Sequence, residues 1–103
     1  MKGVVRLLAM IALIAIVSAV AVPVLAESWQ TRYGLKNLVL DDSGDYVRNL
    51  QADLQDLGYS VRVSGSFDTN TEREVKKFQT RKGLNSNGVV GNSTKIALWN
   101  EFH

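Results

Sequence analysis

The chain has 103 residues, a formal net charge of +2, one histidine and no cysteine. This length accommodates one domain, and the lack of cysteine excludes disulfides, thiolate nucleophiles and cysteine-based metal sites. Because the only histidine is at position 103, a catalytic triad or a histidine metal site would rest on the last residue. We therefore predict a protein that is not an enzyme and that uses no metal or cofactor.

The first 26 residues differ from the rest of the chain. Lys2 and Arg6 precede an uncharged, mostly apolar run that ends at Ala26. A short cationic start, an apolar run and a small-residue ending are typical of a secretory signal peptide, so we expect cleavage after Ala26. The uncharged run of 20 residues is also long enough to span a bilayer, which leaves an uncleaved membrane anchor as the alternative. Both readings place residues 27–103 outside the cytoplasm.

The charge of the remaining chain is balanced. The leader holds two of the twelve cations and none of the ten anions, so residues 27–103 carry ten of each. A neutral chain is a poor match for nucleic acid, and we predict no nucleic-acid partner. We expect the cationic cluster of this part to be a solvated helix face, with contact to an anionic ligand as the alternative. The cluster consists of Arg73, Lys76, Lys77, Arg81 and Lys82.

Residues 27–37 are polar and lack clear periodicity, so we assign them as an N-terminal extension. It is either a tail or a segment that docks Trp29 and Tyr33 on the domain, which we assign to residues 38–103.

Three helices are predicted in that domain. Apolar residues at helical spacing from Val47 to Leu57 predict a helix over about 45–57. A second helix over about 69–82 follows Asp68, a good N-cap residue. A third, over about 92–101, follows Gly91 and is expected to place Phe102 in the core.

The two halves of the domain resemble each other. The Val47 and Gln51 pair returns 28 residues later as Val75 and Gln79. The motif Gly65-x-Phe67-x-x-x-Thr71 returns 23 residues later as Gly88-x-Val90-x-x-x-Thr94. Because each half is too small to fold alone, we predict a mainly α, compact three-helix bundle built from two related half-units with short extended loops.

These motifs form an ordered series that covers about residues 38–100. Its members are Gly44, Val47, Leu50, Gln51, Leu54, Leu57, Gly58, Tyr59, Gly65, Phe67, Thr71, Val75, Phe78, Gln79, Gly83, Leu84, Asn87, Gly88, Val89, Val90, Gly91, Thr94 and Leu98. The series resembles the peptidoglycan-binding domain family, which consists of small three-helix modules often fused to bacterial cell-wall hydrolases.

The resemblance implies a secreted or periplasmic, cell-wall-associated module that binds peptidoglycan, through its glycan or its stem peptide, without catalysis. A cell-wall hydrolase is a possible second partner, and a membrane is a partner only if the leader is uncleaved. The alternative is an extracytoplasmic interaction or regulatory domain that keeps the fold without binding the wall. Asp41 and Asp68 depart from the family pattern, in which glycine is usual at both positions.

The candidate site residues fall into two groups. Polar and aromatic residues near the loops 59–67 and 84–91 are ligand-binding candidates, because they suit sugar hydroxyls, sugar faces or stem-peptide carboxylates. These are Tyr59, Arg62, Arg73, Asn85, Asn87 and Trp99, and Tyr46 has the same aromatic chemistry. The second group has structural roles, and in it we expect the Gln51 and Gln79 amides to bond loop backbone and hold the half-units together. This group is Gly44, Gln51, Gly65, Thr71, Gln79, Gly88, Gly91 and Thr94.

Overall fold

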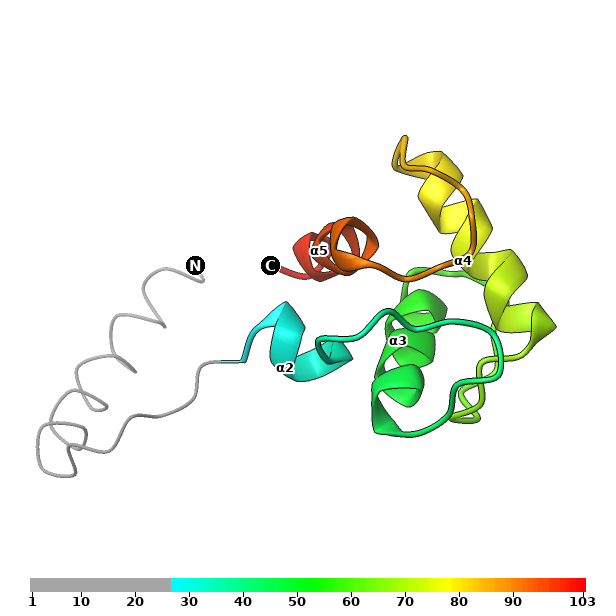
Figure 1. Ribbon diagram of the computed structural model, residues 1–103. Helices are drawn as coiled ribbons and strands as arrows, with labels where there is room; N and C mark the ends of the chain where they lie inside the picture. The colour runs from blue at the N-terminus through cyan, green and yellow to red at the C-terminus, as the bar shows by residue number, and fades with distance from the viewer. Residues whose placement is uncertain (1–26) are drawn as a thin grey trace, which may run out of the picture.

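The computed structural model describes residues 27–103, so the expected signal peptide lies outside the described residues. The described part contains four α-helices, two isolated antiparallel bridges and no strand (Figure 1). The helices are α2 (Trp29–Tyr33), α3 (Asp45–Asp56), α4 (Thr69–Arg81) and α5 (Asn92–Asn100). The predicted mainly helical fold is confirmed, and α3, α4 and α5 are the three predicted helices. Among residues 27–103, no helix combines the length and the apolar character that crossing a membrane requires.

The helix α2 was not predicted, because its five residues have too few turns to show a periodic pattern. Ser28 caps it, with its hydroxyl accepting a hydrogen bond from the Thr31 amide at 3.2 Å. Its last residue, Tyr33, is fully buried in the hydrophobic core. The extension is therefore docked on the rest of the fold, and α2 lies beside α3 and α5, on the side opposite α4 (Figure 1).

The core is formed by the apolar stripes of α3 and α4 together with residues from the connecting segments. Its largest members are aromatic, and they are buried along with leucines and valines from all parts of the described chain. The members are Tyr33, Leu38, Val47, Leu50, Leu54, Val61, Phe67, Val75, Phe78, Val90 and Leu98. The prediction for Phe102 was wrong: α5 ends at Asn100, and the Phe102 side chain is 42% exposed.

One segment, residues 38–44, connects the two half-units and turns at residues 40–41. Leu38 exchanges both backbone hydrogen bonds with Val90, at 3.1 and 2.9 Å. At its other end the segment pairs with Phe67, which donates to the Asp42 carbonyl and accepts from the Asp41 amide, both at 2.8 Å. Phe67 and Val90 occupy equivalent positions in the internal repeat, so the segment bonds the same site of each half.

Asp41 lies in this segment with φ +79°, the one positive φ among the non-glycine residues of 27–103. Left-handed backbone favours glycine, with aspartate and asparagine the best tolerated alternatives. This conformation gives a physical reason for the glycine that is usual at this position in the family. The second departure, Asp68, is the N-cap of α4 and accepts from the Thr71 amide at 2.9 Å.

Candidate functional site

Two buried glutamines shape the loops that flank α4. Gln51 accepts hydrogen bonds from the Ser64 and Gly65 amides, at 2.9 and 2.8 Å. Its amide group donates to the Ser66 carbonyl at 2.8 Å and to the Thr71 hydroxyl at 3.0 Å. One side chain on α3 thus determines the shape of the loop that precedes α4.

Gln79 repeats this arrangement in the second half-unit. It accepts from the Gly88 amide at 2.9 Å and donates to the Val89 carbonyl at 2.9 Å and the Thr94 hydroxyl at 3.0 Å. Each glutamine therefore binds the loop and the next helix of its own half. Both turns need glycine at their centre, since φ is +86° at Gly65 and +79° at Gly88.

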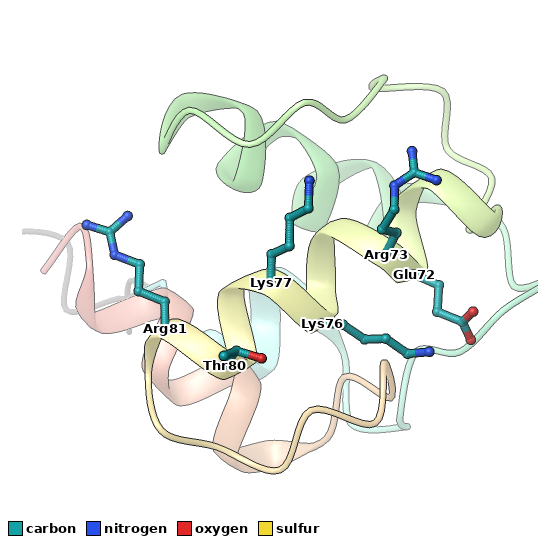
Figure 2. Close-up of a pocket in the computed structure, with 6 residues that line it drawn as sticks. All are labelled: Glu72, Arg73, Lys76, Lys77, Thr80 and Arg81. Carbon is teal, nitrogen blue, oxygen red and sulfur yellow. The ribbon is translucent and has the colours of Figure 1, made fainter.

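The outer face of α4, the helix that connects these two loops, forms an open groove of about 520 Å³ lined by side chains of α4 itself. Figure 2 shows two rows of side chains along the helix. One row is Arg73, Lys77 and Arg81, at i, i+4 and i+8, and the other is Glu72, Lys76 and Thr80. Four cations against one acid make this groove a cationic surface.

Glu74 is a buried residue of α4 that pairs with two of the groove cations. Its side chain is almost fully buried, accepts from the Ser60 amide at 3.0 Å and pairs with Lys77 at 2.9 Å and Arg73 at 3.7 Å. Burial alone would raise the pKa of the Glu74 carboxyl. The hydrogen bonds from Lys77 and Ser60 and the nearby cationic charges outweigh burial and hold that pKa below its ordinary value. Lys76 and Arg81 form no ion pair within residues 27–103, so both remain available to an anionic ligand.

The structure places the six ligand-binding candidates in different environments. Arg73 lies in the groove, and Asn85 and Asn87 are exposed in the flanking loop. The Asn87 side-chain oxygen Oδ1 accepts from the Val89 amide at 2.9 Å, so this side chain also shapes its own turn. Arg62 is exposed in the loop before α4.

The two aromatic candidates lie outside the groove. Tyr59 packs edge-on against Phe78, with ring centroids 6.0 Å apart, and its hydroxyl is buried without a partner among residues 27–103. Trp99 stacks on His103 at 3.6 Å and lines a small cavity of about 190 Å³ beside Arg32 and Asp53. The candidates thus do not form one site.

The predicted ligand-binding set lacked the other residues of the groove. These are Glu72, Lys76, Lys77, Thr80 and Arg81. The sequence did show a signal for them, the four-residue spacing of cations between positions 73 and 81. A solvated helix face has the same pattern, and only the flanking loops distinguish the two cases.

Comparison with known proteins decides the family. Residues 43–98 match the family profile described as "Putative peptidoglycan binding domain". The chain belongs to this peptidoglycan-binding domain family. The prediction made from the ordered motif series is therefore confirmed.

Similar proteins include members with very different total lengths. The chain is 46% identical over 60 residues to an uncharacterized protein of Kitasatospora aureofaciens, a match covering 56% of this chain and 51% of the relative. It is 40% identical over 57 residues to the N-acetylmuramoyl-L-alanine amidase CwlM of Mycobacterium tuberculosis, covering 54% of this chain and 14% of the amidase. The chain thus spans about half of the first relative and a small part of the second.

Two solved structures share the fold of this chain. The SleB N-terminal domain superposes with a TM-score of 0.65 and 30% identity, covering 67% of this chain and 96% of that one. A peptidoglycan-binding protein from Clostridioides difficile gives a TM-score of 0.61 and 34% identity, covering 62% and 40%. The family match begins at residue 43, so α2 and most of the segment that joins the half-units lie outside it.

Proposed function

We propose that this protein is exported and binds cell-wall peptidoglycan, without catalysing a reaction, through the groove on α4. The observation that carries the proposal is the row of cations from Arg73 to Arg81 on the exposed face of α4. Peptidoglycan stem peptides present carboxylates, which arginine and lysine bind through charge-assisted hydrogen bonds. Family membership supports this ligand.

The environment of the buried acids supports binding over catalysis. Within residues 27–103 the buried carboxylates are Asp53 and Glu74. Asp53 accepts from Arg32 and Tyr33, and Glu74 accepts from Ser60 and pairs with Lys77. A general acid needs a proton to donate near neutral pH, whereas the pKa of the Glu74 carboxyl is held below its ordinary value, and every contact of Asp53 joins α3 to the extension. Both acids therefore suit structural roles.

Co-sedimentation with purified sacculi tests the proposal. The protein expressed from the 103-residue sequence is expected to pellet with sacculi and to stay in the supernatant without them. Arg81→Glu and Lys76→Glu should each weaken binding by about tenfold or more, because a charge-assisted contact becomes a repulsion. The double variant Gln30→Glu/Ser93→Glu lowers the net charge by the same amount on exposed positions away from the groove, and it should bind like the wild type.

Two outcomes contradict the proposal. Protein that remains in the supernatant with sacculi, across pH and salt, shows that peptidoglycan is not the ligand. Equal losses in the groove variants and in the control variant show that net charge, and not the α4 groove, drives sedimentation. Export is tested separately by the mass of the protein released from the producing cell, which is expected to begin at Glu27. A retained leader would indicate a membrane anchor.

A second candidate function, recognition of a protein partner, is favoured by the internal repeat. The repeat displacement of 28 places Lys77 and Arg81 of α4 at the positions of Asn49 and Asp53 on α3. On α3 these two positions are covered by α2, with Asn49 donating to the Arg32 carbonyl at 2.8 Å. On α4 they are exposed. We expect the partner to be a cell-wall hydrolase with an acidic segment that binds this face of α4. The hydrolase and this protein should then form a stable complex in the absence of peptidoglycan.

A further inference from the structure

A second cavity, of about 560 Å³, lies where the extension meets the start of α3. Its lining combines the Tyr46 ring and three aliphatic residues with polar and charged side chains. The aliphatic residues are Leu35, Leu38 and Val39, and the polar and charged ones are Lys36, Asn37, Asp42 and Ser43. Of these residues, only Tyr46 and Ser43 fall in the part matched by the family profile, so most of the lining precedes the start of that match. None of its residues lines the α4 groove.

Tyr46 forms an aromatic platform in this cavity. A Cβ atom at Gly34 would lie 2.7 Å from Cδ2 and 2.8 Å from Cε2 of Tyr46, so the ring rests directly on the Gly34 backbone. Gly34 also has φ +79°, a backbone conformation that is a second reason, besides the close contact with Tyr46, for glycine at this position. With this support the Tyr46 side chain is still 50% exposed, and Leu35 beside it is 79% exposed. An aromatic ring is thus held in place while half of it faces solvent.

Polar groups suited to hydroxyl and amide ligands surround the ring. The Asn37 amide and the Ser43 hydroxyl are exposed and make no hydrogen bond within residues 27–103. One Asp42 oxygen accepts from the Val39 amide at 2.9 Å, which fixes this carboxylate at the edge of the cavity. Donors and acceptors are therefore both present, without the excess of cations found on α4.

A buried lysine fixes the backbone beneath the cavity. The Lys95 ammonium donates to the Gly34 carbonyl at 2.8 Å and to the Lys36 carbonyl at 2.6 Å. These bonds tie the segment under Tyr46 to α5. Because the segment is already ordered, a ligand would not have to supply the free energy of ordering it.

The cavity and the α4 groove lie on two sides of one loop. Leu38, which lines the cavity, pairs with Val90, and Gly88 of the same loop packs against Glu72 and Lys76 of the groove. One polymer that carries both sugars and peptides can therefore contact both surfaces across residues 88–90.

We propose that this cavity is a subsite for a sugar ring of the peptidoglycan glycan strand, separate from the stem-peptide contacts on α4. The ring of Tyr46 would stack on the apolar face of a pyranose, while Asn37, Ser43 and Asp42 would bind its hydroxyl and acetamido groups. The lining holds one cation, Lys36, and one acid, Asp42, so a carboxylate-bearing peptide would gain less there than on the cationic face of α4. The proposal rests on the proposed function and adds the sugar as the ligand of this second surface.

Binding to two peptidoglycan fractions tests the subsite. The first is denuded glycan strands, prepared by removing stem peptides from sacculi with an amidase, and the second is the free stem peptide. The product of the complete chain should bind denuded strands, and Tyr46→Ala should weaken that binding by about three- to tenfold. Tyr46→Phe keeps the ring and should bind like the wild type. Phe102→Ala removes another exposed aromatic, outside both surfaces, and should also leave binding unchanged.

The outcomes separate this inference from the proposed function. Binding to intact sacculi without binding to denuded strands overturns the sugar subsite alone, as does a folded Tyr46→Ala protein that binds strands like the wild type. Tyr46-dependent binding to strands, together with no effect of Arg81→Glu on sacculi or stem peptide, overturns the α4 assignment alone. Binding to neither fraction nor to sacculi overturns both. A circular dichroism spectrum and a melting curve for each variant establish that it is folded.

Discussion

The Gln51 side chain donates to the Thr71 hydroxyl at 3.0 Å, and this contact joins α3 to the first turn of α4. Both residues are fully buried. Thr71 in turn donates to Asp68, the N-cap of α4, at 2.9 Å. A helix start, a loop and the preceding helix thus share one chain of hydrogen bonds, and Gln79 and Thr94 form the same contact at 3.0 Å in the other half-unit.

The repeated contact permits a double-mutant cycle with an internal control. Gln51→Ala should lower the free energy of unfolding by about 2–4 kcal/mol, since it leaves buried loop amides and a carbonyl unpaired. Combined with Thr71→Val, it should show a coupling free energy of about 1 kcal/mol or more, measured by urea unfolding. Gln51→Ala combined with Thr94→Val joins residues from different half-units and should be additive. Equal coupling in both pairs would show that the two networks are not independent.

Most of the helical fold could be predicted from the sequence, because apolar spacing, N-cap residues and glycines give local signals. The starts of α3, α4 and α5 follow from Gly44, Asp68 and Gly91, which precede them directly. The helix α2 has an N-cap residue, Ser28, but its five residues are too few for an apolar repeat, and the contacts that hold it are made far away in the sequence. Arg32 and Tyr33 both bind Asp53, which lies 21 and 20 residues further along the chain. No periodicity within residues 27–37 indicates that contact.

The candidate site was less predictable than the fold. A cationic row on a helix has the same sequence whether the helix faces open solvent or lies between two loops. Tyr46 had the right chemistry in the sequence, but its role as a platform depends on Gly34, twelve positions earlier. The burial of Lys95 was equally hidden, because its acceptors are backbone carbonyls and carry no side-chain signature.

Docking of the extension should depend on Asp53. Its carboxylate accepts from Arg32 Nε at 2.6 Å, Arg32 Nη2 at 2.7 Å and the Tyr33 hydroxyl at 2.5 Å. Asp53→Leu leaves the buried Tyr33 hydroxyl and the Arg32 guanidinium without their partner, and should cost about 2–4 kcal/mol in urea unfolding. Asp56→Leu, an exposed position on the same helix, should change stability by about 0.5 kcal/mol or less. Similar losses in the two variants would contradict this account of docking.

Acid should weaken the fold through Glu74. Because its pKa lies below the ordinary value of 4.5 in the folded protein, the unfolded chain takes up a proton first as the pH falls. Glu74 therefore contributes stability above about pH 4.5, and this contribution is lost as the pH falls through its folded pKa. Glu74→Gln should cost about 1–2 kcal/mol at neutral pH, less than a fully buried pair because Lys77 is exposed.

The measurement for Glu74 is the difference in unfolding free energy between wild type and Glu74→Gln from about pH 7 to about pH 3. The difference should shrink on the acid side of the range. A difference that stays constant down to about pH 3 would show that the Ser60 and Lys77 contacts do not stabilise the ionised carboxylate.

Alkaline pH should strengthen the fold through Lys95. Burial lowers the pKa of its ammonium below the ordinary value of 10.5, so the folded protein releases this proton at a lower pH than the unfolded chain. Where the unfolded chain holds more protons, stability rises with pH, by about 1.4 kcal/mol for each unit by which the pKa is lowered. The rise should end near pH 10. Burial and the Asp53 hydrogen bond raise the pKa of Tyr33, so above the ordinary tyrosine value the unfolded chain loses this proton first and the stability that Tyr33 contributes begins to fall.

Urea unfolding from about pH 7 to about pH 10 should show wild type gaining stability relative to Lys95→Met. Lys36→Met, which removes an exposed lysine from the segment that Lys95 holds, should keep the wild-type pH dependence. Parallel curves for wild type and Lys95→Met would show that burial does not lower the pKa of the Lys95 ammonium.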